Sequence, residues 1–209
     1  MATTSETYDK KYSSGKGWKY SEGSEGSNVD RIVRAAAWVE DDRVLEIGCG
    51  EGFHAHALAK RGLNVIAIDI SRMGIINAQK KYGSVPNLEY VSGDLASWAP
   101  VERELDGIFC RGMSWYHYEM DERSKYDVIG NTRRLFGWLK KGGTFVLQVA
   151  THFTGSRPKN DIHNNLVPDY IGLFERFGTV EYIADFRGNI LPRVKEAKGY
   201  SGITISTRK

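Results

Sequence analysis

The sequence predicts an α/β protein in which helices cover both faces of a mostly parallel sheet. Two short apolar segments, residues 44–47 and 64–69, are typical of strands that are buried on both faces. Between them, good helix formers at residues 55–60 precede Gly62, a residue type that commonly ends a helix. The order strand, helix, strand indicates a layered α/β arrangement.

Further helices are expected where apolar residues recur every three or four positions. The first such face begins at Val29, just after Ser27 and Asn28, either of which could cap the helix. Similar patterns predict helices over residues 71–82, 121–139 and 169–177. Residues 180–184 and 202–207 alternate between apolar and polar side chains, which predicts an antiparallel hairpin at the sheet edge.

The composition is that of an ordinary globular protein, with 41% hydrophobic and 26% charged residues in a chain of 209. This length predicts one domain, which we assign to residues 28–209. The formal charge of +3 permits an anionic substrate but does not indicate nucleic-acid binding, for which a clustered basic face is expected. No apolar run approaches the roughly 20 residues that a membrane helix requires.

The expected location is the cytoplasm. Residues 1–14 are polar and lack the apolar core of a signal peptide. Two cysteines, Cys49 and Cys110, do not make a disulfide framework, as expected in a reducing compartment. The five histidines and two cysteines also lack the spacing of a structural metal site, so no metal is expected.

A glycine-rich turn follows the strand at residues 44–47, with the spacing Gly48-x-Gly50-x-Gly52. Glycines let the backbone turn sharply and approach a ligand closely. Asp69 lies 21 residues after Gly48 at the end of the next strand, where a carboxylate can accept both hydroxyls of a ribose. The pattern predicts a nucleoside-containing cofactor. Phe53 occupies the position of the third glycine of a dinucleotide fingerprint, which disfavours a nicotinamide-dependent oxidoreductase.

With Glu46 two residues before the first glycine, this segment resembles the cofactor loop of class I S-adenosylmethionine-dependent methyltransferases. Residues 87–95 resemble the third strand and acidic turn of that family, residues 105–112 its fourth strand, and residues 133–147 its following helix, turn and fifth strand. Lys141 stands where the family usually has proline. The resemblance implies a small, single-domain methyltransferase with a three-layer, Rossmann-like, seven-stranded sheet and a C-terminal antiparallel hairpin strand.

The resemblance also implies which residues bind S-adenosylmethionine. Those expected around the methionine part are Glu46, Gly48, Cys49, Gly50 and Gly52. Those expected at the nucleoside are Asp69 on the ribose, Ile70 on the adenine face, and Asp94 and the Leu95 backbone at the adenine amine. Glu46 could also satisfy amides of the loop itself, and Asp94 could be a simple turn residue. Arg111 ends the fourth strand beside the cofactor and could hold a carboxylate or phosphate.

Residues 111–118 follow the fourth strand, where the transferred methyl group is expected. The Asp/Asn-Pro-Pro-aromatic motif that indicates amine methylation of nucleic acids or proteins is absent. His117 is the candidate general base, since imidazole titrates near neutral pH, although it could instead cap a helix or support the loop. The loop over residues 152–163 is partly basic, and in this family that region usually builds the acceptor pocket. The expected substrate residues are Tyr12, Trp18, Trp115, Tyr116, His152 and Arg157.

Residues 1–27 form an N-terminal segment rich in Ser, Gly and aromatic residues. It is either a leader or a lid of the kind that the family often folds over the methionine end of its cofactor. Its four aromatic residues are unusual for a solvated tail, since disordered segments contain few of them. They are Tyr8, Tyr12, Trp18 and Tyr20.

The predicted function is methyl transfer to a small-molecule acceptor, on an oxygen of an anionic or hydroxylated metabolite, with S-adenosylhomocysteine as the product. Alternatives are an N-methyltransferase of a small amine, a methyltransferase of RNA or protein, and a cofactor-binding protein without catalysis. The expected partner is therefore the acceptor alone, without nucleic acid or membrane. A monomer or a homodimer is expected.

Overall fold

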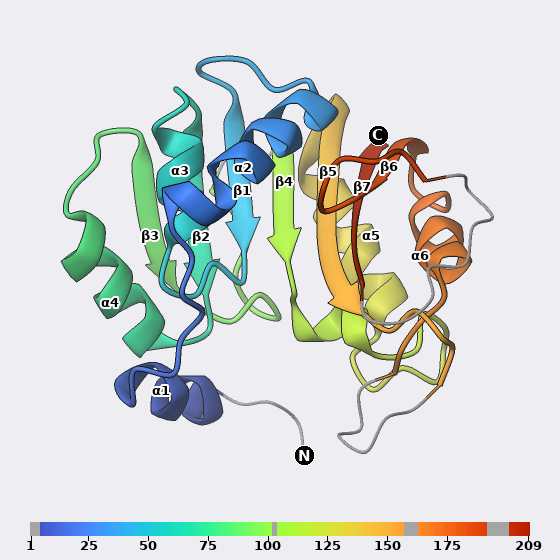
Figure 1. Ribbon diagram of the computed structural model, residues 1–209, viewed down its shortest axis with the longest axis horizontal. Coiled ribbons are helices and arrows are strands. Elements are labelled where there is room, and N and C mark those ends of the chain that lie inside the picture. The colour runs from blue at the N-terminus through green and yellow to red at the C-terminus, as the bar shows by residue number, and fades with distance from the viewer. Residues whose placement is uncertain (1–4, 102–103, 157–162, 192–200) are drawn as a thin grey trace.

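The computed structural model describes residues 5–101, 104–156, 163–191 and 201–209, which form one seven-stranded sheet in the order β3-β2-β1-β4-β5-β7-β6 (Figure 1). Strand β7 is antiparallel to both of its neighbours, and the pairs from β3 to β5 are parallel, which confirms the predicted fold class. The strands are β1 (Arg43–Ile47), β2 (Asn64–Asp69), β3 (Leu88–Ser92), β4 (Leu105–Arg111), β5 (Leu139–Thr151), β6 (Thr179–Asp185) and β7 (Ser201–Arg208).

Two apolar clusters, one on each face of the sheet, make up the core. Because side chains alternate along a strand, neighbouring residues such as Val44 and Leu45 belong to different clusters, and both are fully buried. One face is covered by α2 (Glu22–Ala36), α3 (Phe53–Ala59) and α4 (Arg72–Tyr82), and the other by α5 (Val128–Trp138) and α6 (Val167–Phe174). This burial on both faces explains the near-continuous apolar strands of the sequence.

Helix α2 begins well before the predicted start at Asn28. Its N-cap is Ser21, whose hydroxyl accepts a hydrogen bond of 3.3 Å from the Ser24 amide. The prediction of Ser27 or Asn28 as the cap was therefore wrong, and the predicted boundary between residues 27 and 28 falls inside a helix. Arg61 donates hydrogen bonds to Glu22 and to the carbonyl oxygen of Gly26, which stabilises this glycine-containing half of α2.

The first residues of the described chain form a further helix, α1 (Ser5–Ser13). It lies at the carboxyl ends of the parallel strands (Figure 1). Oδ1 of Asp9 accepts hydrogen bonds of 2.6 Å from the Ser71 hydroxyl and 2.9 Å from the Met73 amide. Asp9 therefore binds the N-terminal end of α4, a position that favours a carboxylate.

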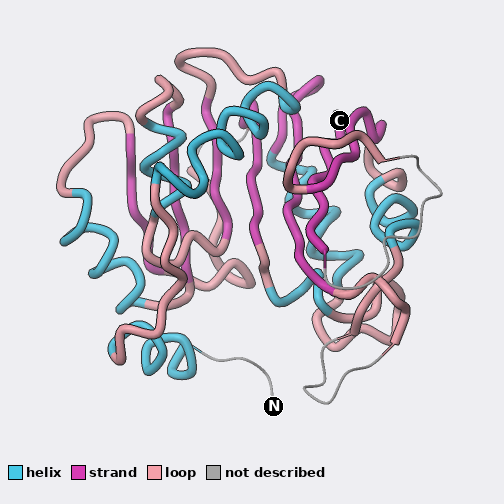
Figure 2. Tube along the Cα trace, viewed as in Figure 1, coloured by secondary structure: helices cyan, strands magenta, loops and turns pink. Residues whose placement is uncertain are grey.

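Helix α5 begins at Val128, later than the predicted residue 121, because residues 121–126 form turns. Asp127, with a φ of 43°, caps α5 by accepting a hydrogen bond of 3.1 Å from Gly130. A short 3₁₀ helix, η1 (Ser114–His117), follows β4. Figure 2 shows how loops gather at the lower edge of the sheet, where β1, β2 and β4 end. None of the helices in the described ranges is long and apolar enough to cross a membrane.

Candidate functional site

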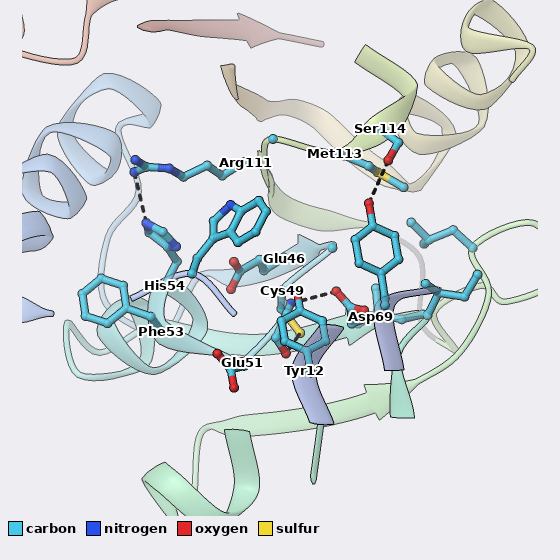
Figure 3. Close-up of a pocket in the computed structure, with 18 of the residues that line it drawn as sticks. Tyr12, Glu46, Cys49, Glu51, Phe53, His54, Asp69, Arg111, Met113 and Ser114 are labelled. Atoms are coloured by element: carbon cyan, nitrogen blue, oxygen red, sulfur yellow. Dashed lines mark hydrogen bonds between the residues drawn. The ribbon is translucent and has the colours of Figure 1, made fainter. Parts of the chain in front are cut away.

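A pocket opens between α1 and the carboxyl ends of β1, β2 and β4 (Figure 3). Nearly all of the residues predicted to bind the cofactor line it: Glu46, Gly48, Cys49, Gly50, Asp69, Ile70, Asp94, Leu95 and Arg111. These residues come from three strand ends and from the loops after β1, β2 and β3. The topology brings them together because the carboxyl ends of parallel strands meet at one edge of the sheet.

The glycine loop requires its glycines for different reasons. Gly48, Gly50 and Gly52 have φ values of 70°, 55° and 74°, a region that other residues rarely adopt. A Cβ on Gly50 would lie 2.6 Å from the Tyr12 hydroxyl, on the pocket side. A Cβ on Gly52 would lie 2.7 Å from the Tyr90 ring, behind the loop. Gly52 therefore makes room for packing, and it does not line the pocket.

Asp69 links the loop after β1 to the start of α4. The residue is 8% exposed. Oδ2 accepts a hydrogen bond of 2.8 Å from the Gly50 amide, and Oδ1 accepts one of 2.8 Å from the Ser71 amide. Burial raises the pKa of Asp69, although these two hydrogen bonds oppose the rise. Each oxygen keeps a second lone pair, so the carboxylate can still accept hydrogen bonds from a ligand.

Glu46 points into the middle of the pocket (Figure 3). Its side chain is 2% exposed, and the Ala55 amide donates a hydrogen bond to its carboxylate. Its Oε2 atom has no hydrogen-bond partner in the described structure. Burial and the nearby Asp69 carboxylate raise the pKa of Glu46 well above its ordinary value. An unpartnered buried carboxylate oxygen is costly unless a ligand satisfies it.

Arg111 lies in a partly buried ion pair that the sequence did not predict. Its Nη1 donates a hydrogen bond of 2.7 Å to Oε2 of Glu25, on α2, and lies 3.3 Å from Nε2 of His54, on α3. The guanidinium also stacks against the rings of Tyr20 and Phe186, at 4.8 and 5.0 Å from their centroids.

Glu25 responds strongly to this environment. Burial alone would raise its pKa, but hydrogen bonds from His54 and Arg111 lower the pKa of Glu25 to about 2. The positive charge of Arg111 is therefore compensated inside the protein. This pairing weakens the expectation that Arg111 holds an anionic ligand.

Residues of the N-terminal segment line the pocket. The Tyr8 hydroxyl and the Ser114 hydroxyl lie 2.9 Å apart, so α1 reaches from α4 across to η1. Tyr8, Lys11, Tyr12 and Trp18 all line the pocket, as does Tyr20. The Nζ atom of Lys11 lies 2.8 Å from the centroid of the Trp18 ring, which is 55% exposed at the rim.

A second hollow adjoins the first at the ends of β5, β6 and β7. The two share Trp18, Tyr20, Arg111 and Gly112. Among the residues that line only the second are His117, Gln148 and residues 185–187, which begin at the last residue of β6. Burial lowers the pKa of His117 to about 4, and its Nδ1 is buried without a partner in the described structure.

The predicted substrate residues fall in different places. Trp115 lines the first pocket, together with Tyr12 and Trp18. Tyr116 is fully buried in the core, where its hydroxyl lies 3.2 Å from that of Thr132, so the prediction that it contacts the substrate was wrong. Adjacent residues of η1 point in different directions, which the sequence alone did not distinguish. His152 is exposed and lines neither hollow, and Arg157 lies outside the described residues.

Several site residues were missed because no local pattern marks them. Glu25 and Gln148 both bond to Asn28 as well as to Arg111, which forms a buried network between α2, β4 and β5. His54 directly follows Phe53 at the start of α3 and could have been noticed as a polar residue in an apolar segment. In the described ranges, no cluster of three or more His, Cys, Asp or Glu residues could hold a metal ion.

Comparison with known sequences agrees with this geometry. Residues 44–143 match a protein family described as a methyltransferase domain. A probable thiol methyltransferase of Arabidopsis thaliana is 36% identical over 70 residues, which are 32% of this chain and 30% of that protein. A putative methyltransferase of Bacillus subtilis, YqeM, is 26% identical over 120 residues, which are 56% of this chain and 46% of that protein. The matches span less than half the length of these relatives.

Solved structures share the fold. The crystal structure of the cyclase SpnF has a TM-score of 0.74 at 13% identity, covering 99% of this chain and 97% of that one. The N-methyltransferase NodS from Bradyrhizobium japonicum, in complex with S-adenosylhomocysteine, has a TM-score of 0.66 at 15% identity, covering 88% of this chain and 87% of that one. At such low identities the likeness concerns the fold alone.

Proposed function

This chain carries a domain of the class I S-adenosylmethionine-dependent methyltransferase family, and we propose that it methylates an oxygen atom of a small anionic or hydroxylated molecule. The observation that carries the proposal is the pair of adjoining hollows. The first pocket has buried carboxylates that suit a positively charged ligand containing a nucleoside. The other opens beside it and is lined by aromatic side chains, by Arg111 and Arg187, and by His117.

The first pocket fits the cofactor on two grounds. The buried Glu46 has a carboxylate oxygen without a protein partner in the described structure, which suits the positively charged end of a ligand. Asp69 has one lone pair left on each oxygen, which suits the hydroxyls of a ribose. Ile70, Asp94 and Leu95 line the same pocket and would receive the adenine.

S-adenosylmethionine bound there would supply a methyl group on a positively charged sulfur atom. The contribution of this chain is then to align the acceptor with the methyl group and to exclude water. Alignment of two reactants can account for much of the rate enhancement of such a step. Trp18, Tyr20 and Gly112 line both hollows, so the acceptor is expected to approach at these residues.

The second hollow favours an anionic acceptor. Arg187 is exposed on its wall and, in the described parts of the chain, has no carboxylate within ion-pair distance. The nearby Asp185 carboxylate instead accepts hydrogen bonds of 2.9 and 2.8 Å from the amides of Arg187 and Asn189. Because Arg111 is already paired with Glu25, Arg187 is the better candidate to bind a carboxylate or phosphate.

The position of His117 in the second hollow is compatible with an oxygen acceptor. Burial lowers its pKa to about 4, so the imidazole is neutral near pH 7 and free to accept a proton, although it is a weaker base than an ordinary histidine. An amine acceptor that is already deprotonated would need no such base. Transfer to a small amine therefore remains the alternative that a His117 variant tests most directly.

We also infer that residues 5–20 act as a lid. The Tyr8–Ser114 and Asp9–Ser71 hydrogen bonds support this role, because they attach α1 to both sides of the pocket. The segment would exclude water once the cofactor is in place.

Binding and transfer experiments test the function in two stages. In calorimetry, S-adenosylhomocysteine should bind the full chain, and NAD should not. A methylation screen with labelled S-adenosylmethionine should then compare hydroxylated acids, matched amines, RNA and peptides. Methylation of an acid at oxygen supports the proposal, and methylation of an amine or a macromolecule alone contradicts it. Cofactor binding without transfer to any class would identify a cofactor-binding protein without catalysis.

A further inference from the structure

Two buried carboxylates, Glu46 and Asp69, line the same pocket but differ in their hydrogen bonds. They are 2% and 8% exposed. Asp69 accepts hydrogen bonds from two backbone amides, which favour its charged form. Glu46 receives one from Ala55, and its Oε2 has no partner in the described structure. When the pocket contains no cation, a single proton shared between them is therefore held by Glu46.

Arg111 lowers the pKa of Glu46, but its own charge is already paired with Glu25. Lys11 and Lys81 also line the pocket, and neither is a hydrogen-bond partner of Glu46 in the described structure. Burial lowers the pKa of His54, so this neighbouring histidine of the pocket is neutral. The remaining titratable groups that interact with Glu46 are neutral as well, since burial raises their pKa values: Cys49 on the loop, Tyr90 on β3 and Cys110 on β4.

The cofactor and its product differ by one charge. S-adenosylmethionine carries a sulfonium, an ammonium and a carboxylate at neutral pH, whereas S-adenosylhomocysteine has lost the sulfonium charge. The sulfonium charge interacts strongly with the two buried carboxyl groups, because water is excluded from the pocket. A nearby positive charge favours the ionised form of a carboxyl group, so the protonation of Glu46 can differ between the two ligands.

We propose that Glu46 determines the preference of the pocket for S-adenosylmethionine over S-adenosylhomocysteine by releasing its proton to solvent when the sulfonium cation binds. The neutral sulfur of the product allows Glu46 to hold the proton again. No covalent bond other than the carboxyl O–H changes. The inference rests on the proposed cofactor, and it adds a role for Glu46 in favouring release of the product.

Calorimetry in buffers of different ionisation enthalpy counts the protons released on binding. At pH 7, S-adenosylmethionine should release close to one proton more than S-adenosylhomocysteine. Glu46→Gln keeps an acceptor for the Ala55 amide but cannot lose a proton, so the two ligands should then release equal numbers. The ratio of their affinities should fall about tenfold, the equivalent of one pKa unit. Glu51→Gln, on the same loop and in the same pocket, is the matched control and should keep the difference.

A second measurement uses the unaltered protein and does not depend on how the variant folds. The affinity ratio of S-adenosylmethionine to S-adenosylhomocysteine should increase with pH, because release of a proton is easier at high pH. A ratio that is constant with pH, or equal proton counts for the two ligands, would overturn the role of Glu46. Failure of the unaltered protein to bind either ligand would instead overturn the proposed cofactor.

Discussion

The Gly50 amide donates a hydrogen bond of 2.8 Å to Oδ2 of Asp69 and so joins the loop after β1 to the end of β2. The other carboxylate oxygen accepts a hydrogen bond from Ser71, the N-cap of α4. One side chain therefore fixes the loop, the strand end and the start of a helix. Its predicted contact with a ribose would be added to this structural role.

Replacing Asp69 with alanine should weaken S-adenosylhomocysteine binding by about 1–3 kcal/mol, the cost of leaving buried polar partners unsatisfied. Asp69→Asn keeps one oxygen acceptor and should bind with intermediate affinity. Titration calorimetry measures both, with circular dichroism to show that each variant is folded. Unchanged affinity in the alanine variant would contradict the ribose assignment.

Gly50→Val should abolish cofactor binding in a folded protein. The φ of 55° is strained for valine, and its Cβ would lie 2.6 Å from the Tyr12 hydroxyl, on the side from which a ligand approaches. The control is Gly137→Ala on α5, where no atom lies within 4 Å of the added Cβ. This control should bind normally and gain up to about 1 kcal/mol of stability, since alanine favours a helix. Normal binding by a folded Gly50 variant would disprove the close approach.

Asp9→Ala should detach α1 from α4. Removing a capping carboxylate typically costs about 1 kcal/mol, so amide exchange over residues 5–13 should accelerate while that of α5 stays unchanged. Hydrogen bonds from Ser71 and Met73 lower the pKa of Asp9, so the contact is present at neutral pH and is lost as pH falls through that lowered pKa. Glu6→Ala, an exposed change on the same helix, should leave exchange unaltered.

Removal of residues 1–20 should leave a folded protein that has lost most of its turnover. Ser21, the N-cap of α2, remains in the truncated chain, so the cap of that helix is preserved. Thermal unfolding checks the fold, and a labelled-methyl assay checks turnover. Full activity after truncation would show that the segment is a leader and not a lid.

His117→Asn should lower turnover by roughly 10²–10⁴-fold, the range for a general base. Affinity for S-adenosylhomocysteine should barely change, since His117 lines the second hollow and not the first. Because burial lowers the pKa of His117 to about 4, protonation would inactivate the base only in acid. Turnover should be constant around neutral pH and should fall only as the pH approaches about 4. A histidine with an ordinary pKa would instead lose activity near pH 6.5. Near-native turnover in the variant would assign His117 to loop support.

The segment from β1 to β2 was predictable because its signals are local. Buried strands, positive-φ glycines and an acid at a strand end all lie within one short stretch, and each has its own physical cause. The start of α2 was not predictable, because Gly23 and Gly26 weaken the local helix signal and Arg61 supplies the stabilising contacts from elsewhere in the chain. The late start of α5 likewise depends on Asp127, which adopts an uncommon left-handed conformation to cap it.

The site was less predictable than the fold where it depends on partners distant in sequence. No local pattern pairs Glu25 with Arg111, which are separated by 86 positions. Because Glu25 neutralises the charge of Arg111, this arginine is a poorer candidate for binding an anion than the sequence indicated. In η1, only three-dimensional packing separates Trp115, at the pocket, from Tyr116, in the core.

The position of β7 has a consequence for how the protein is made. β7 follows β5 and β6 in the chain but lies between them in the sheet. During translation, β6 therefore leaves the ribosome before the strand with which it pairs, and one edge of β5 stays open until residues 201–208 have emerged. Exposed strand edges recruit other chains. Chains that stop before residue 201 are therefore expected to associate with one another through the open edge of β5 more readily than the full chain.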